Sequence, residues 1–346
     1  MTTYLLVFMI AWGLAYSITP LSIRLGQRLD LADQPGGRRQ HAGAISRLGG
    51  LALFGGFVGT GSLLFIASGL GLGGEALRIQ GEDYKLLSGI LVGSTIIFGL
   101  SLADDWYELS ARSQFLIHLL ATGIAIYFDI IFQVVTLPIV GETQFEWWLY
   151  YPLTVFWIVG MINTVNWLDG LDGLAAGVTA IASLIFAIHA YRLGQSVVAF
   201  FPLALAGACL GFLPANFYPA RVFMGGGSML LGYALATMSI LAPAKIATAL
   251  LVLGIPILDV AWLIIYRWRQ RGNPMQSGRD HLHYRLFDLG FSQRQIVLLY
   301  YSFCGLFGLQ ALLITDRLYK LLALIIMSGL TLALLWWLAQ RGDGAK

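Results

Sequence analysis

The residues best suited to chemistry are polar side chains that gather where apolar segments end. The densest group lies in the run from Asn163 to Gly177, which reads N-x-x-N-x-x-D-G-x-D-G-x-x-x-G and contains Asn163, Asn166, Asp169 and Asp172. Each Asp-Gly step favours a turn and interrupts a helix. Two carboxylates and two carboxamides held together offer hard oxygen ligands for Mg²⁺ and hydrogen-bonding groups for a nucleotide. The alternative is a pair of ordinary turns, but such turns would require neither the two asparagines nor their spacing.

A second group is the adjacent pair Asp104 and Asp105, which directly follows an apolar segment. Neighbouring carboxylates repel each other unless a cation or a shared proton relieves the repulsion. The pair therefore suits a divalent metal ion or acid–base catalysis. A solvated helix end is the alternative, because it can carry the same two residues.

Two histidines, His281 and His283, stand two residues apart in the basic segment Gly278–Leu286, beside Arg279 and Arg285. Histidine and arginine can bind a pyrophosphate through hydrogen bonds and charge. Zinc ligation is an alternative, although no cysteine or further histidine is near in sequence. A basic patch that contacts anionic lipid is another.

A further basic segment, Asp33–Gly50, follows the first apolar run. Its Arg38 and His41 could meet the phosphate of a lipid headgroup. A simple excess of positive charge in cytoplasmic loops would explain the arginines but not His41.

The elements that must position these groups are apolar helices. Hydrophobic residues make up 58% of the 346-residue chain and charged residues 11%, too few to cover a soluble protein. The apolar runs are continuous rather than alternating, and many reach the roughly 20 residues that a membrane-spanning helix needs. We expect one all-α polytopic membrane domain over residues 1–346, with about eleven transmembrane helices. These are predicted near residues 3–22, 48–70, 86–103, 114–130, 150–165, 174–192, 196–213, 227–243, 246–265, 295–314 and 320–339.

Basic residues divide unequally between the two alternate sets of loops. All but six of the 21 lysines and arginines lie near residues 23–47, 104–113, 166–173, 214–226 and 266–294 or at the C-terminus. The positive-inside rule predicts that this set is cytoplasmic, with the N-terminus outside and the C-terminus in the cytoplasm. The aspartates described above fall on the same side, which indicates an active site facing the cytoplasm.

Two other protein classes fit the sequence less well. The net charge of +3 gives no reason to expect nucleic-acid binding. A transporter would place acids midway through its spans and would be built from inverted repeats, and neither feature is visible.

Taken in order, these motifs resemble the polyprenyl-phosphate N-acetylhexosamine-1-phosphate transferases. The resemblance runs from about Asp33 to about Ser292 and includes a P-x-x-R-x-x-H pattern at Pro35, Arg38 and His41. It implies a polytopic, often homodimeric enzyme of the bacterial cytoplasmic membrane that uses Mg²⁺ (or Mn²⁺). The implied substrates are a UDP-N-acetylhexosamine and undecaprenyl phosphate, which lies in the lipid bilayer.

The resemblance also implies roles for individual residues. Asp104 or Asp105 would deprotonate or orient the lipid phosphate that attacks the UDP-sugar. The metal would be held by Asp105, Asp169 and Asp172. The substrates would be contacted by Asn163, Asn166, Asp169, Asp172, His281, His283, Arg285, Arg38 and His41.

The histidine segment is similar to the D-H-x-H-H-R-L of the N-acetylglucosamine branch, with Tyr284 in place of one histidine. This similarity favours UDP-GlcNAc as the donor and a reaction that starts a lipid-linked glycan, as in O-antigen, common-antigen or teichoic acid synthesis. The alternative within the family is the phospho-N-acetylmuramoyl-pentapeptide transferase of peptidoglycan synthesis.

One segment departs from the family pattern. Relatives carry M-G-D-x-G-S before a span, and the aspartate is a metal ligand, whereas this chain reads M-G-G-G-S over Met224–Ser228. Loss of a carboxylate should weaken a hard-cation site. Either another acid substitutes, with Asp172 or Asp105 as candidates, or the chain is a catalytically impaired homologue.

Overall fold

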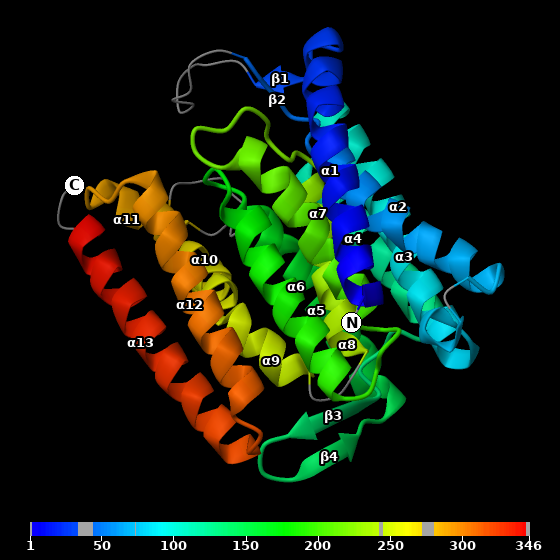
Figure 1. Cartoon of the computed structure of the whole chain (residues 1–346). Helices are drawn as coiled ribbons and strands as arrows, with labels where there is room; N and C mark the ends of the chain where they lie inside the picture. Colours follow the sequence, from blue (N-terminus) through cyan, green and yellow to red (C-terminus); the bar gives the residue numbers. More distant parts are fainter. Residues whose placement is uncertain (1, 34–43, 73, 242–244, 272–279, 344–346) are drawn as a thin grey trace.

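Most of the described chain is helical in the computed structural model, which describes residues 2–33, 44–72, 74–241, 245–271 and 280–343 (Figure 1). The α-helices are α1 (Thr2–Arg28), α2 (Gly50–Gly69), α3 (Gly81–Tyr107), α4 (Ala111–Tyr127), α5 (Trp147–Leu168), α6 (Leu174–Arg192), α7 (Phe200–Asn216), α8 (Gly227–Ile240), α9 (Lys245–Val252), α10 (Gly254–Arg271), α11 (Leu282–Asp288), α12 (Gln293–Leu313) and α13 (Arg317–Asp343). A 3₁₀ helix, η1, covers Gly74–Leu77.

Two small antiparallel hairpins lie at opposite ends of the helices (Figure 1). Strand β1 (Ala32–Asp33) pairs with β2 (Ile45–Ser46), and β3 (Val134–Leu137) pairs with β4 (Gly141–Gln144). A bridge between Ser46 and Val222 also ties β2 to the segment that leads into α8. The two hairpins therefore mark the two ends of the helical bundle.

Each expected membrane span overlaps one helix of the structure, except the span at 246–265, which overlaps two. Among the described residues, seven helices are long and apolar enough to cross a bilayer, or eight if α9 and α10 are counted as one bent span. Helices α7 and α8 are apolar but shorter. The prediction of an all-α polytopic membrane protein is confirmed, whereas the number of eleven crossings stays a prediction.

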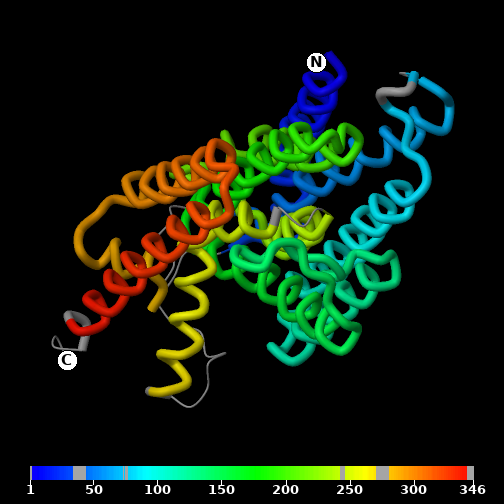
Figure 2. Tube along the Cα trace, turned by 90° about the horizontal axis from the view of Figure 1, so that it is seen from below, coloured from blue at the N-terminus to red at the C-terminus, as the bar shows by residue number. Residues whose placement is uncertain are grey.

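The expected span at 246–265 consists of two helices. Helices α9 and α10 meet at an angle of 77° around Leu253. Figure 2 shows this sharp turn in the yellow part of the chain, with the N-terminal helices and the α12–α13 pair on opposite sides of the central helices. After the break, α10 carries Asp259 toward α11.

The centre of the bundle is α8, whose residues are all buried. A helix that is apolar on every side is typical of such a position. It packs mainly against α5 and α3, and more lightly against α2 and α6. Because α8 begins near the points where α3 and α5 end, polar side chains at these three termini come together at the β1–β2 end of the bundle.

Candidate active site

A cavity of about 470 Å³ lies where these helix ends meet. Its described lining contains five aspartates, Asp33, Asp104, Asp105, Asp169 and Asp172. Asn166 and Arg47 line it as well. So many carboxylates in one cavity repel one another, and cations or protons must offset this charge.

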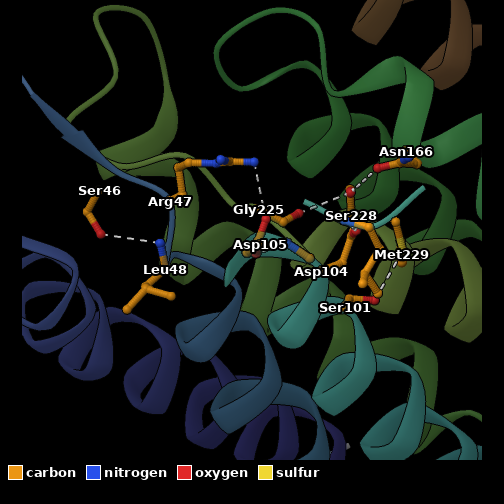
Figure 3. Close-up of polar contacts among 12 residues, drawn as sticks. Ser46, Arg47, Leu48, Ser101, Asp104, Asp105, Asn166, Gly225, Ser228 and Met229 are labelled. Carbon is orange, nitrogen blue, oxygen red and sulfur yellow. Dashed lines mark hydrogen bonds and ion pairs between the residues drawn. The ribbon is translucent and has the colours of Figure 1, made fainter. Parts of the chain in front are cut away.

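The adjacent aspartates at the end of α3 make different contacts. Asp104 Oδ1 accepts a hydrogen bond from the Leu109 N–H (2.9 Å), and its Oδ2 accepts one from Gln114 Nε2 (2.9 Å). Asp105 Oδ2 instead accepts a bond from the Gly226 N–H (2.7 Å) across the cavity wall. Asp104 therefore fastens the end of α3 to the start of α4, while Asp105 connects α3 to the turn before α8. Figure 3 shows Asp105 between Arg47 and Gly225 of that turn.

The turn before α8 is the segment that lacks the family's aspartate. Gly225 adopts a left-handed conformation (φ +50°), and a Cβ there would collide with the Arg47 carbonyl oxygen and the Asp105 carboxylate. The Ser228 hydroxyl lies 2.7 Å from Asn166 Oδ1 and 3.1 Å from the Gly225 carbonyl oxygen. The carboxylate that lies against this turn therefore belongs to Asp105 on α3 and not to a residue of the turn itself.

The two Asp-Gly steps form the connection between α5 and α6. Asp169 ends α5, and Gly173, with a φ of +80°, precedes α6. Asp172 Oδ2 accepts a bond from the Ala220 N–H (3.0 Å), and the Gly173 N–H donates to Asn216 Oδ1 (3.2 Å). These contacts anchor the connection and hold its carboxylates at the cavity.

The carboxylate of Asp169 lies near those of Asp172 and Asp105. It keeps partial exposure toward the cavity. Burial raises the pKa of its carboxyl well above the ordinary value, and the negative charges of Asp172 and Asp105 raise it further. A cation would relieve this repulsion. The three predicted metal ligands, Asp105, Asp169 and Asp172, line the same cavity, and their role as ligands stays a prediction.

The two asparagines of the motif have different surroundings. Asn166 lines the cavity. Asn163 is not among the described lining residues, and its Nδ2 donates to the Val159 carbonyl oxygen (2.8 Å) and lies 3.3 Å from His118 Nδ1 on α4. This arrangement places Asn163 away from the cavity, and its contact with substrate stays a prediction.

The histidine segment lies behind the Asp-Gly connection. His283 is fully buried, and its ring packs so closely against Gly170 that a Cβ there would collide with Nε2. The Tyr284 hydroxyl donates to the Gly170 carbonyl oxygen (3.2 Å), and Tyr284 lines the cavity. Burial lowers the pKa of His283 to about 3, so this imidazole is neutral at physiological pH and supports the connection as an uncharged group.

Asp259 on α10 positions the start of the histidine segment. Its Oδ1 accepts a bond from the Leu282 N–H (2.9 Å), and its Oδ2 lies 3.2 Å from His281 Nδ1. Asp259, His281 and His283 are all buried and offer ligand atoms within 4.8 Å of one another. Among the described residues, this group has the spacing of a metal site, whereas the three aspartates at the cavity do not form such a group.

The remaining predicted site residues lie elsewhere. Arg285 Nε donates to the Asp280 carbonyl oxygen (2.8 Å), and its guanidinium carbon lies 5.2 Å from the centre of the Tyr266 ring. It is not among the described residues that line the cavity. Arg38 and His41 fall outside the described residues.

Several cavity residues were not predicted from sequence. Gln114 belongs to no motif, whereas Ser228 and Tyr284 belong to segments that were singled out but were given no role at the site. Arg47 was counted only among the basic residues of a cytoplasmic loop. The available signal was its place within the basic segment Asp33–Gly50, which also carries the predicted lipid-phosphate contacts Arg38 and His41.

An acidic cavity at the end of apolar, membrane-length helices defines a membrane protein with a candidate site for a cation. Residues 87–243 match glycosyl transferase family 4. The chain belongs to this family, which confirms the resemblance predicted from its motifs.

Relatives with N-acetylglucosamine in their names align with most of the chain. The probable undecaprenyl-phosphate N-acetylglucosaminyl 1-phosphate transferase of Bacillus subtilis is 33% identical over 86% of this chain and 81% of its own length. The decaprenyl-phosphate N-acetylglucosaminephosphotransferase of Mycobacterium tuberculosis is 34% identical over 92% of this chain and 85% of its own. The phospho-N-acetylmuramoyl-pentapeptide-transferase of Desulforudis audaxviator is 34% identical over 48% of this chain and 52% of its own.

Proposed function

We propose that the protein transfers N-acetylglucosamine-1-phosphate from UDP-GlcNAc to undecaprenyl phosphate, releases UMP and so starts a lipid-linked glycan. The observation that carries this proposal is the convergence of Asp105, Asp169 and Asp172 with Arg47 in one cavity at the end of the membrane helices. The named N-acetylglucosamine transferases support this donor over the muramoyl-pentapeptide, because they align with a larger share of the chain.

The proposed reaction joins two phosphorylated substrates. An oxygen of the acceptor phosphate attacks the β-phosphorus of UDP-GlcNAc, the bond from that phosphorus to the bridging oxygen breaks, and UMP leaves with the bonding electrons. Asp105 orients or deprotonates the acceptor phosphate. Asp105, Asp169 and Asp172 would hold Mg²⁺ (or Mn²⁺), which neutralises the charge that gathers on the diphosphate.

The other predicted substrate contacts differ in where their side chains lie. Asn166 lines the cavity and is proposed to contact the nucleotide. Asn163, His281, His283 and Arg285 bond or pack against other side chains here, so we propose that they act indirectly or after a rearrangement. Arg38 and His41 remain proposed contacts on the family resemblance.

We further propose that the cavity faces the cytoplasm of a bacterial cell, with the enzyme in the cytoplasmic membrane. Arg47 and Arg112, which the charge pattern assigns to the cytoplasm, lie at the cavity end of the bundle. The β3–β4 hairpin lies at the other end (Figure 1). On the family resemblance, we also propose that residues 1–346 form a single domain and that the protein assembles as a homodimer.

The donor can be tested with radiolabelled nucleotides. With undecaprenyl phosphate and Mg²⁺ present, the purified protein is expected to move label into lipid from UDP-GlcNAc at least about 100-fold more efficiently than from UDP-MurNAc-pentapeptide, because a site built for one sugar rejects a poorly fitting one. In sealed vesicles, externally added UDP-GlcNAc should be used only when the cytoplasmic face is outward. The reverse donor preference would select the peptidoglycan alternative. Absence of label from both donors would sink the transferase proposal.

The unusual turn before α8 offers a test of the impaired-homologue alternative. Insertion of an aspartate between Gly225 and Gly226 is expected to leave UMP release unchanged within about twofold or to lower it. The carboxylate of Asp105 already lies against this turn, and an extra residue would disturb its bond to the Gly226 N–H. An inserted alanine is the matched control. A large gain with aspartate alone would show that the turn lacks a metal ligand that the enzyme needs.

A further inference from the structure

Arg47 is the one cationic side chain in the described lining of an otherwise acidic cavity. Both proposed substrates bring phosphate groups into this space. Five nearby aspartates would repel those phosphates, so every positive charge in the cavity has a large effect on binding.

The backbone around Arg47 is fixed from both sides. The Arg47 N–H donates to the Leu31 carbonyl oxygen (3.0 Å). The Phe223 N–H donates to the Ser46 carbonyl oxygen (2.8 Å), and the Gly49 N–H donates to the Phe223 carbonyl oxygen (2.9 Å). These bonds join the segment to the start of the α8 turn, so Arg47 projects from a rigid support, as a binding residue requires.

The guanidinium group itself has spare bonding capacity. Its described polar contact is a single long one, from Nη2 to Asp105 Oδ1 at 3.5 Å, and the side chain is 32% exposed. A well-formed arginine–carboxylate bond measures about 2.7–2.9 Å and often uses two donors. Four of the five guanidinium N–H groups are therefore available to a ligand.

We propose that Arg47 binds a phosphate group of a substrate through two guanidinium N–H donors. This inference rests on the proposed function and deepens it, because it assigns a phosphate contact to a residue outside the sequence motifs. The phosphate belongs to the lipid acceptor or to the nucleotide donor, and the two sources share this chemistry. Arg47 lies three residues before the membrane helix α2, where an acceptor phosphate would meet Asp105.

The test compares Arg47→Gln and Arg47→Lys with the wild type and with Arg112→Gln. Arg112 is an exposed arginine at the same end of the bundle and is not part of the described cavity lining. Equilibrium affinity would be measured in detergent for undecaprenyl phosphate against undecaprenol and for UDP-GlcNAc against uridine. The KM of each substrate and kcat would be measured in parallel.

Arg47→Gln is expected to weaken binding of one phosphorylated ligand by about 10- to 100-fold, the usual effect of losing a charge-assisted contact. Binding of its phosphate-free counterpart should not change. Arg47→Lys should recover part of the loss, because lysine keeps the charge but not the two-donor geometry. A selective effect on undecaprenyl phosphate or on UDP-GlcNAc would identify the source of the phosphate.

Affinities for both ligands within twofold of the wild type would overturn the proposal, as would an equal loss in Arg112→Gln. If Arg47→Gln does not fold, Arg47→Lys is tested instead. It should also weaken binding of one phosphorylated ligand without changing binding of its phosphate-free counterpart. Failure of the proposed function is a separate result. In that case the wild type would transfer no sugar phosphate, while binding of undecaprenyl phosphate would still report on Arg47.

Discussion

Asp105→Asn is expected to lower kcat for UMP release by about 10²- to 10⁴-fold, the range for loss of a catalytic acid or base. The variant keeps the size of the side chain and can still accept the bond from the Gly226 N–H. It removes the negative charge that would orient or deprotonate the acceptor phosphate and hold the metal. Because the fold should survive, the loss should appear in kcat under saturating UDP-GlcNAc and lipid, measured with the purified protein.

Asp104→Asn is the matched control for this prediction. Asp104 uses one oxygen for the Leu109 N–H and the other for Gln114. An asparagine can keep the first bond and reverse the second, since the Gln114 amide can also act as an acceptor. We expect less than a tenfold fall in kcat and a small decrease in thermal stability. Equal losses in both variants, or a nearly active Asp105→Asn, would contradict the division of roles between the two aspartates.

The membrane helices could be predicted from sequence because hydropathy alone sets their length and approximate position. Hydropathy alone does not locate the break between α9 and α10. Gly254 and Pro256 lie in that apolar run next to the bend at Leu253, and both residue types favour a break in a helix. Length and composition likewise leave the number of crossings unsettled for short helices such as α7 and α8.

The site was predictable in part, for a similar reason. The sequence places Asp105, Asp169 and Asp172 at the ends of separate spans on one predicted side of the membrane, and the structure brings them to one cavity. The sequence does not set the direction in which each side chain points. Asn163 and Asn166 are three residues apart on one helix, and only the second reaches the cavity lining.

The histidine segment shows a further limit of motif reasoning. Histidines beside arginines indicate a pyrophosphate site when read as a linear pattern. In the folded chain, His283 is buried against Gly170, and Asp259 holds the segment from 22 residues upstream of His281. Contacts between such distant residues cannot be read from the local sequence.

Asp169→Asn is expected to lower kcat by at least about 100-fold and to abolish stabilisation by Mg²⁺. The side chain sits beside Asp172 and Asp105, whose charges add to the effect of burial in raising its pKa. A bound cation would turn this repulsion into attraction. At a Mg²⁺ concentration of about 100 times its Kd, the wild type should gain about 2.7 kcal/mol of stability. Thermal unfolding with Mg²⁺ and with EDTA measures the difference, and EDTA should also stop UMP release by the wild type.

The same substitution should have the opposite effect on the metal-free protein. A pKa that is raised in the folded state means that the ionised carboxylate destabilises the fold. The metal-free wild type should therefore lose stability as the pH rises from the unfolded-state pKa of Asp, about 3.9, through the higher folded-state pKa. Asp169→Asn has no ionising group at this position, so it should be more stable than the wild type in EDTA at neutral pH and should lack that pH dependence.

A matched control separates this effect from a general loss of charge. Glu142→Gln removes an exposed carboxylate from β4, at the other end of the bundle, and should alter neither Mg²⁺ stabilisation nor kcat. An Asp169→Asn protein that is inactive and less stable than the wild type in EDTA would indicate a structural carboxylate. An inactive variant that is more stable without metal would show that Asp169 is held at an energetic cost that a bound cation offsets, as expected for a functional site.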